Sequence, residues 1–313
     1  MLSVIMPAYN EEKMIFTAAR TIGEVLGGEN ICYELIFVDD GSRDQTWSQI
    51  MAAADSDPCV RGVHFSRNFG KEAAMFAGLE QAAGECCVVL DCDLQHPPEK
   101  IVEMYRLWEQ GYEVVEGVKE SRGRESAAHS FAAGTFYRLM SRATGFDMAD
   151  SSDFKLLDRK VVDALNRMPE RNVFFRALSH WVGFRTASVS YCVQERTAGE
   201  SKWSTRSLIK YALTNITSFS SAPLHMVTFL GCLMLLVAVV LGAVSLIQKF
   251  CAAALSGFTT VIIIQLFTGS IVMISLGIIG LYIAKIYEEC KGRPKYIIST
   301  TCGGVRRDSK IAG

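Results

Sequence analysis

Two long stretches without a charged residue constrain this chain more than any other feature. Residues 211–248 and 250–284 contain no Asp, Glu, Lys or Arg. Their most apolar windows, about 224–248 and 258–284, both exceed the roughly 20 residues that a helix needs to cross a bilayer. The alternative is a pair of buried helices in a large soluble protein, but such helices rarely run so far without a charge. The sequence therefore predicts a two-helix transmembrane hairpin over residues 223–286.

The charges beside these stretches predict the orientation of the hairpin. The flanking basic residues are Arg206 and Lys210 before it, and Lys285, Lys291, Arg293 and Lys295 after it. The connecting loop, about residues 249–257, holds one Lys. Segments rich in Lys and Arg beside membrane spans usually stay on the cytoplasmic side. We therefore expect a multi-pass protein of the inner (cytoplasmic) membrane with the N-terminal body and both termini cytoplasmic. Residues 287–313 would then form a basic cytoplasmic tail, of which residues 299–313 are expected to be flexible.

The charge distribution argues against nucleic acid as a partner. The 313 residues have a net charge of −1, but residues 1–205 carry 22 Lys and Arg against 30 Asp and Glu, a net of −8. A domain that binds nucleic acid presents a basic face instead. We therefore expect an acidic body, an apolar hairpin and a basic tail.

Short apolar runs alternate with helical patterns through the first 120 residues. We predict strands at residues 2–6, 33–38, 60–65, 86–90 and 113–117, and helices at residues 11–26, 44–54, 71–83 and 98–110. This alternation is typical of an α/β fold with a mainly parallel sheet and right-handed crossovers. Ligands of such sheets bind beyond the carboxyl ends of the strands. The residues that follow each strand are therefore the first candidates for a site.

Polar motifs follow three of these strands and would meet at one rim. They are Pro7-Ala8-Tyr9-Asn10-Glu11, Asp39-Asp40-Gly41-Ser42 and Asp91-Cys92-Asp93-Leu94-Gln95. Asp91 and Asp93 would repel each other unless a cation lay between them. Their hard oxygens suit Mg²⁺ or Mn²⁺ held together with substrate phosphates, and a solvated strand end is the alternative. A second D-x-D, at residues 55–57, precedes Pro58 and is interpreted as a solvated turn.

The residues that follow the second strand also have two interpretations. Asp40 would accept hydrogen bonds from a ribose or a base, or the Asp-Gly turn would simply cap the next helix. The chain has neither G-x-G-x-x-G nor G-x-x-x-x-G-K. This absence disfavours an ordinary NAD enzyme and a P-loop ATPase.

Together these motifs resemble those of a known family. PAYNE at 7–11, VDDGS at 38–42 and DCDLQ at 91–95 are similar to the signature motifs of family-2 glycosyltransferases with a GT-A fold. SDFKL at 152–156, ERTAGESKW at 195–203 and the two apolar stretches resemble polyprenyl-phosphate glycosyltransferases, among them bactoprenol glucosyltransferases and dolichol-phosphate mannose synthases. The resemblance extends to about residue 295. It implies a Rossmann-like GT-A catalytic domain over residues 1–203.

The resemblance also implies roles for individual residues. The base and ribose of the donor would contact Pro7, Tyr9, Glu11, Val38 and Asp40. The divalent metal and the diphosphate would be held by Asp91 and Asp93, with Gln95 near the metal or the sugar. Arg196 and Lys202, in the pattern R-x-x-G-x-S-K, would bind the donor diphosphate or the acceptor phosphate. Lys119, Arg122 and Arg124 lie where relatives carry basic residues that face the acceptor phosphate.

The implied reaction moves one sugar from a nucleotide-sugar to polyprenyl (undecaprenyl) phosphate. It is inverting and uses Mg²⁺ or Mn²⁺, and the closeness to bactoprenol glucosyltransferases favours a UDP-sugar over a GDP-sugar. Asp153 is considered as a base or as a partner of a sugar hydroxyl; its alternative role is to cap the helix that begins near Arg159. A tetramer is expected only by analogy with bacterial relatives.

The segment before the hairpin is predicted to be an amphipathic juxtamembrane helix. Residues 204–222 carry an apolar stripe at helical spacing, with Arg206 and Lys210 beside it. Such a helix would lie on the membrane surface or pack against the catalytic domain.

Two further functions fit part of the pattern. A processive polysaccharide synthase would share the DDGS and D-x-D motifs. Such enzymes typically carry a Q-x-x-R-W motif and more spans, whereas here Gln194-Glu195-Arg196 does not fit that motif and only two spans are predicted. A non-catalytic membrane scaffold could keep the fold, although it would not need clustered charges at one rim. The sequence does not name the sugar, because donor choice depends on the shape of the pocket.

Overall fold

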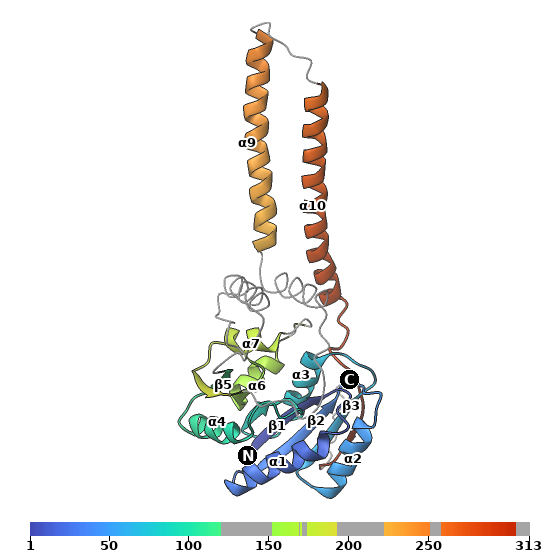
Figure 1. Cartoon of the computed structure of the whole chain (residues 1–313), viewed down its shortest axis with the longest axis vertical. Helices are drawn as coiled ribbons and strands as arrows, with labels where there is room; N and C mark the ends of the chain where they lie inside the picture. The colour runs from blue at the N-terminus through green and yellow to red at the C-terminus, as the bar shows by residue number, and fades with distance from the viewer. Residues whose placement is uncertain (120–151, 169, 171–173, 193–221, 251–257, 305–313) are drawn as a thin grey trace. The chain divides into compact units, whose positions relative to one another are not determined.

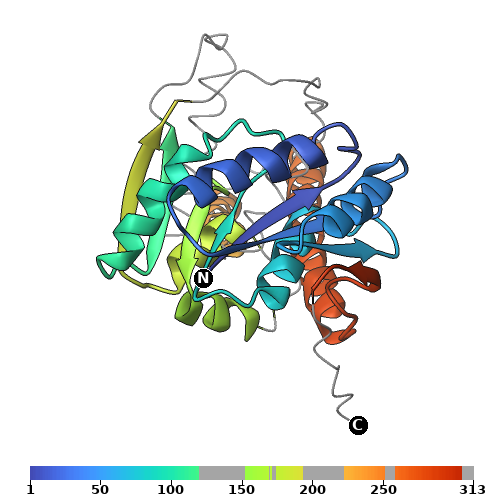
Figure 2. The same cartoon turned by 90° about the horizontal axis from the view of Figure 1, so that it is seen from below.

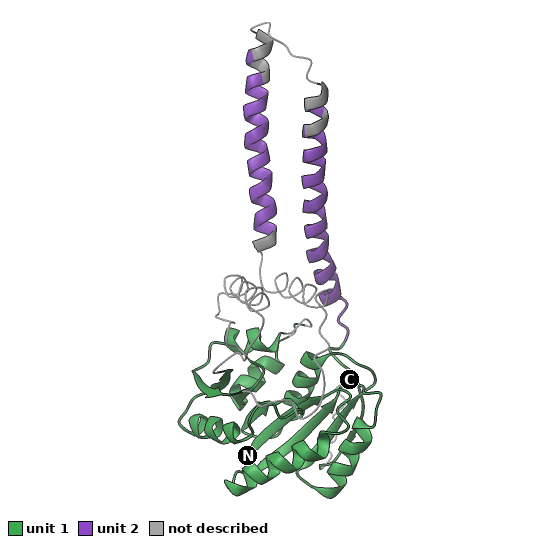
Figure 3. Ribbon diagram, in the orientation of Figure 1, with its two compact units in different colours: residues 1–203, 294–313 green, residues 204–293 purple. Residues whose placement is uncertain are grey.

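The computed structural model describes residues 1–119, 152–168, 170, 174–192, 222–250 and 258–304. They fall into two compact units, residues 1–203 with 294–313 and residues 204–293, which Figure 3 colours separately. The division after Trp203 lies where the catalytic domain was expected to end.

The first unit is built on a mainly parallel sheet that is eight-stranded in the described part of the chain (Figures 1 and 2). Its strands are β1 (Leu2–Ala8), β2 (Tyr33–Asp39), β3 (Val60–Phe65), β4 (Cys86–Val89), β5 (Val114–Lys119), β6 (Lys155–Asp158), β7 (Thr186–Tyr191) and β8 (Ile298–Cys302). They lie in the order β7-β5-β6-β4-β1-β2-β3-β8. β6 and β8 pair antiparallel with their neighbours, and the other pairs are parallel. The prediction of a GT-A-like α/β fold is confirmed.

Helices pack on both faces of this sheet (Figure 2). They are α1 (Ile15–Gly28), α2 (Thr46–Ser56), α3 (Lys71–Gln81), α4 (Glu99–Glu109), α6 (Arg159–Asn166) and α7 (Phe175–Trp181). α1 contacts α2 and α4, whereas α3 contacts α6, which contacts α7. Because side chains alternate along a strand, Val4 and Met6 of β1 share a core with α1 and α4, and Ile5 faces α3. Gly78 lets α3 lie close, since a Cβ there would collide with Ile5.

Strand β6 was not predicted, and the first helix begins later than predicted. β6 lies between β4 and β5, where Leu156 is opposite Val88 on one side and Val115 on the other. The first helix begins at Ile15 rather than at Glu11. The Glu11 N–H donates to Thr46 Oγ1 at 2.8 Å, so the first residue of α2 satisfies a backbone donor that the first turn of a helix would leave unpaired.

The C-terminal segment corrects the prediction that the chain is flexible from residue 299 onward. Residues 298–302 form β8, which pairs antiparallel with β3. The ring of Tyr296 stacks on Phe65, with 5.0 Å between ring centroids, and its hydroxyl donates to Glu80. The Lys295 Nζ donates to the Met168 carbonyl at 3.0 Å. Without β8, strand β3 would be an unprotected edge of the sheet, and this explains why a polar segment is ordered here.

The described part of the second unit contains two long helices, α9 (Ala222–Phe250) and α10 (Phe258–Cys290). Within them, Leu224–Val244 and Ile264–Cys290 are long and apolar enough to cross a membrane. Large apolar side chains on both helices are exposed, such as Leu236 at 63% and Met273 at 70%. The predicted amphipathic helix at 204–222 lies outside the described residues, except for Ala222, where α9 begins.

We expect Tyr296→Ala to lower the stability of the first unit by about 2 kcal/mol, because it removes an aromatic stack on β3 and a hydrogen bond to Glu80 of α3. The measurement is the unfolding midpoint of purified protein in detergent. Ile297→Ala, at a neighbouring side chain that is 51% exposed, is the matched control. Equal midpoints for the two variants would contradict the structural role of the Tyr296 contact.

Candidate functional site

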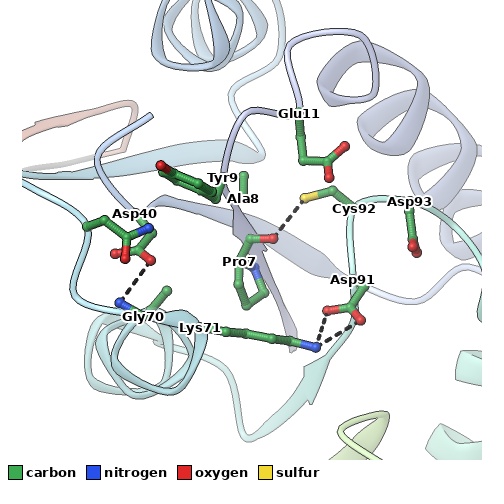
Figure 4. A pocket seen from close by; sticks show the side chains of 12 residues that line it. Pro7, Ala8, Tyr9, Glu11, Asp40, Gly70, Lys71, Asp91, Cys92 and Asp93 are labelled. Atoms are coloured by element: carbon green, nitrogen blue, oxygen red, sulfur yellow. Dashed lines mark hydrogen bonds and ion pairs between the residues drawn. The ribbon is translucent and has the colours of Figure 1, made fainter. Parts of the chain in front are cut away.

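A pocket of about 370 Å³ lies beyond the carboxyl ends of β1, β2, β3 and β4 (Figure 4). Its lining comes from four segments: Pro7, Ala8, Tyr9 and Glu11; Asp40; Asn68, Gly70, Lys71 and Ala74; and Asp91, Cys92 and Asp93. The three predicted motifs therefore do meet at one rim, and the segment after β3 joins them. The volume is in the range of small-molecule sites.

The two aspartates at the end of β2 have different partners. Asp39 is fully buried, accepts the Ser42 N–H at 2.9 Å and lies 2.7 Å from His64 Nδ1. Asp40 accepts the Phe69 N–H at 2.6 Å and the Gly70 N–H at 2.9 Å. Burial raises the pKa of Asp40, although these two hydrogen bonds act against the rise. Asp40 thus fixes the segment after β3 against the end of β2.

Two glycines make this junction possible. Gly41 has a φ of +66°, and a Cβ there would collide with the backbone of Arg67. Gly70 has a φ of +102°, a backbone conformation that residues other than glycine rarely adopt. Lys71 follows directly and begins α3, so its backbone is set at the wall of the pocket.

Lys71 places an ammonium group between two carboxylates. Its Nζ lies 2.7 Å from Asp91 Oδ1 and 2.9 Å from Asp91 Oδ2, and the dashed lines of Figure 4 show this pair. The same Nζ lies 2.9 Å from Asp153 Oδ2. Burial would lower the pKa of Lys71, but the two carboxylates outweigh it and raise the pKa above the ordinary value.

Asp153 is held from its other side by Arg176 of α7. The guanidinium donates to both oxygens, at 2.7 Å and 3.0 Å. Burial alone would raise the pKa of Asp153, but Lys71 and Arg176 hold it well below its usual range. A carboxylate with such a low pKa is a poor proton acceptor, so this geometry favours a positioning role over that of a base. The alternative of a helix cap is wrong, since Asp158 accepts the Lys160 N–H and caps α6.

Further buried charges dock α7 against the sheet. The Lys155 Nζ, fully buried, lies 2.9 Å from Glu116 Oε1 and donates to Ser179 Oγ at 2.8 Å. His180 Nε2 lies 3.1 Å from Glu116 Oε2. Burial opposes ionisation of Glu116, but His180 and Lys155 lower its pKa to about 2. These contacts hold the helix that carries Arg176.

Several predicted residues lie away from the pocket or outside the described chain. Val38 is fully buried within β2, so its side chain has no access to a ligand. The Gln95 N–H donates to Asp93 Oδ1 at 3.1 Å, but Gln95 does not line the pocket. Lys119, at the exposed end of β5, does not line it either. Arg122, Arg124, Arg196 and Lys202 lie outside the described residues.

Sequence reasoning missed three polar residues of this region: Asn68, Lys71 and Arg176. Asn68 and Lys71 follow the third predicted strand, and the same rule that selected the other loops applies to this one. No comparable signal marks Arg176, because only the tertiary fold brings α7 to Asp153.

The donor set fits a divalent cation that is shared with a substrate. Asp91 and Asp93 supply hard carboxylate oxygens to the pocket. Within the described residues, no group of three or more His, Cys, Asp or Glu side chains forms a complete metal site. Mg²⁺ is commonly held by one or two carboxylates together with substrate phosphates, and the two aspartates match that pattern.

The contact of Glu72 in α3 with α7 can be tested by the dependence of stability on pH. It accepts the Phe175 N–H at 2.9 Å, and burial, followed by the nearby Asp153, raises its pKa from 4.5 to about 8 despite the opposing charges of Arg176 and Lys71. Between these values the folded protein keeps a proton that the unfolded chain has lost, so stability falls as the pH rises.

Glu72→Gln keeps the carbonyl acceptor and cannot ionise. We expect its unfolding midpoint to match that of wild type near about pH 5 and to exceed it by about 3 °C or more near about pH 8. Glu99→Gln, at the exposed start of α4, is the control. A difference between Glu72→Gln and wild type that stays constant across this range would contradict the proposed protonation of Glu72.

Comparison with known proteins places the chain in a family. Residues 3–165 match the model described as glycosyl transferase family 2. The chain is 41% identical over 303 residues to the uncharacterized glycosyltransferase YkcC of Bacillus subtilis (strain 168), covering 96% of this chain and 94% of that protein. It is 38% identical over 299 residues to the prophage bactoprenol glucosyl transferase homolog of Escherichia coli (strain K12), covering 95% and 98%.

A solved structure supports the fold assignment. Glucosyl-3-phosphoglycerate synthase from Mycobacterium tuberculosis, crystallised with Mn²⁺, UDP and phosphoglyceric acid, superposes with a TM-score of 0.51 at 18% identity. The match covers 69% of this chain and 76% of that one. The family model spans over half of the chain and the relatives match almost all of it, so the chain belongs to glycosyl transferase family 2 and is a glycosyltransferase.

Proposed function

We propose that this enzyme transfers a single sugar from a nucleotide-sugar, preferably a UDP-sugar, to polyprenyl phosphate. The reaction takes place at the cytoplasmic face of the membrane, inverts the anomeric centre and requires Mg²⁺ or Mn²⁺. The observation that carries the proposal is the meeting of Asp40, Asp91 and Asp93 in one pocket of a chain that also has two exposed apolar helices.

The pocket has the groups that a nucleotide-sugar needs. Tyr9 is 43% exposed at its wall and offers a ring face for a base, and Asp40 lies nearby as a hydrogen-bond acceptor. Asp91 and Asp93 would hold the divalent cation, which would neutralise charge on the diphosphate when bound. Lys71 adds a positive charge to the same wall.

The acceptor is inferred from the relatives and from the helices. A relative that matches 95% of this chain is named as a bactoprenol glucosyl transferase homolog. Apolar side chains exposed along α9 and α10 need a nonpolar environment, and two spans of this length find it in a bilayer. A lipid-linked acceptor would thus meet an enzyme anchored in the same membrane, with both termini on the cytoplasmic side.

The proposed reaction does not need a strong general base. A polyprenyl phosphate is anionic at neutral pH, so its oxygen forms the new bond to the anomeric carbon without first losing a proton. The bond from that carbon to the donor diphosphate breaks, and the nucleoside diphosphate leaves with the electron pair. The larger demand is to stabilise this departing charge. This agrees with Asp153, whose low pKa makes it a poor base.

The test is transfer of labelled sugar into the organic phase. Purified full-length protein is incubated with undecaprenyl phosphate, Mg²⁺ or Mn²⁺, and a panel of UDP- and GDP-sugars. We expect one donor to label the lipid, EDTA to abolish the label, and Asp91→Asn to reduce the rate by about a hundredfold or more.

The second D-x-D of the chain offers a matched control. Asp55→Asn changes an exposed aspartate at the end of α2, away from the pocket, and should keep the wild-type rate. Equal rates for Asp91→Asn and wild type would contradict the assigned site. Nucleotide binding without transfer to any lipid would contradict the acceptor, and loss of both would favour a non-catalytic scaffold.

A further inference from the structure

We propose that Lys71 is an internal counter-ion that competes with the divalent cation for Asp91, and that it thereby makes cation binding depend on the donor diphosphate. The inference rests on the proposed function, because it concerns the same pocket. It adds a residue outside the D-x-D motif that sets when the cation binds.

The contact itself occupies the ligand atoms. The Lys71 Nζ lies within 2.9 Å of both oxygens of Asp91, and a bound cation would use the same oxygens (Figure 4). An ammonium and a dication repel each other when they share one carboxylate. In the described part of the chain, Lys71 is the cationic side chain that contacts Asp91.

The backbone of Lys71 is fixed, but its ammonium is able to leave. Asp40 accepts the N–H groups of Phe69 and Gly70, and this sets where α3 begins. The Lys71 side chain is 42% exposed, so the tip of its flexible stem reaches solvent by rotation alone. Exchange of the ammonium for a cation therefore needs no movement of the sheet.

The two carboxylates depend on Lys71 to different degrees. Asp153 also accepts two hydrogen bonds from Arg176, so it remains paired when Lys71 moves. Asp91 has no such second cation among the described residues. When Lys71 leaves, Asp91 is thus the group that gains affinity for a new cation, whereas the position of Asp153 is held.

The donor diphosphate resolves the competition. Its negative charge attracts both the dication and the ammonium, so it supplies a new partner for Lys71 as it brings ligands for the metal. Without the diphosphate, Lys71 opposes the cation. By reciprocity, the factor by which UDP strengthens Mn²⁺ binding equals the factor by which Mn²⁺ strengthens UDP binding.

The experiment measures Mn²⁺ binding by the electron paramagnetic resonance signal of the free ion, with and without UDP. Lys71→Met keeps the length of the side chain and removes its charge. We expect Lys71→Met to bind Mn²⁺ about tenfold or more tightly than wild type without UDP. We also expect UDP to strengthen Mn²⁺ binding less in this variant than in wild type.

Three variants define the origin of the effect. Lys71→Arg keeps the charge and should retain the weak binding of wild type. Lys160→Met removes a charge that is 75% exposed on α6, away from the pocket, and should change nothing. The double variant Lys71→Met with Asp91→Asn should lose the gain, which would locate the added affinity at Asp91.

Equal or weaker Mn²⁺ binding by Lys71→Met, folded as judged by its unfolding midpoint, would overturn the inference. Wild-type protein gives a second test that needs no variant: Mn²⁺ binding that is equally tight with and without UDP would also overturn it. The proposed function fails separately, because wild-type protein that shows this Mn²⁺ pattern but transfers no sugar would refute the function alone.

Discussion

The ion pairs of Lys71 with Asp91 and Asp153 join parts of the chain that are distant in sequence. Asp91 follows β4, Asp153 precedes β6, and Lys71 opens α3. Two carboxylates this close would repel each other at the mouth of a parallel sheet, and the lysine offsets that repulsion. The arrangement also depends on Asp40, which fixes the turn before Lys71 from the end of the neighbouring strand. The geometry of the pocket thus follows from charges that one fold brings together.

Much of the fold and part of the site could be predicted from local pattern. Strand β3 begins and ends at the predicted residues, because Val60, Val63 and Phe65 form a short, mostly apolar segment between turn residues. The parallel order of the strands then placed the loops that carry Tyr9, Asp40 and Asp91 at one rim. The loop with Lys71 obeyed the same rule, but it lacks a paired-carboxylate motif and was passed over.

The rest depended on contacts that no local pattern encodes. Arg176 reaches Asp153 from a short helix that is docked by the buried Lys155, and its place follows only from the assembled sheet. Val38 shows a different limit of motif matching. It belongs to a motif, but its side chain is buried because β2 is covered on both faces of the sheet. Strand β8 is polar and short, and only the open edge of β3 gives it a reason to form.

The position of β8 in the chain has a consequence for biosynthesis. The strand that completes the catalytic sheet follows both apolar helices in the sequence, so the ribosome makes it after them. Until then β3 has no neighbour on its outer side, and its backbone groups are open to pairing with other chains. In the membrane-anchored enzyme that we propose, insertion of the hairpin and closure of the sheet are therefore successive events. A nascent chain that stalls in the membrane step would carry an unfinished and aggregation-prone catalytic domain.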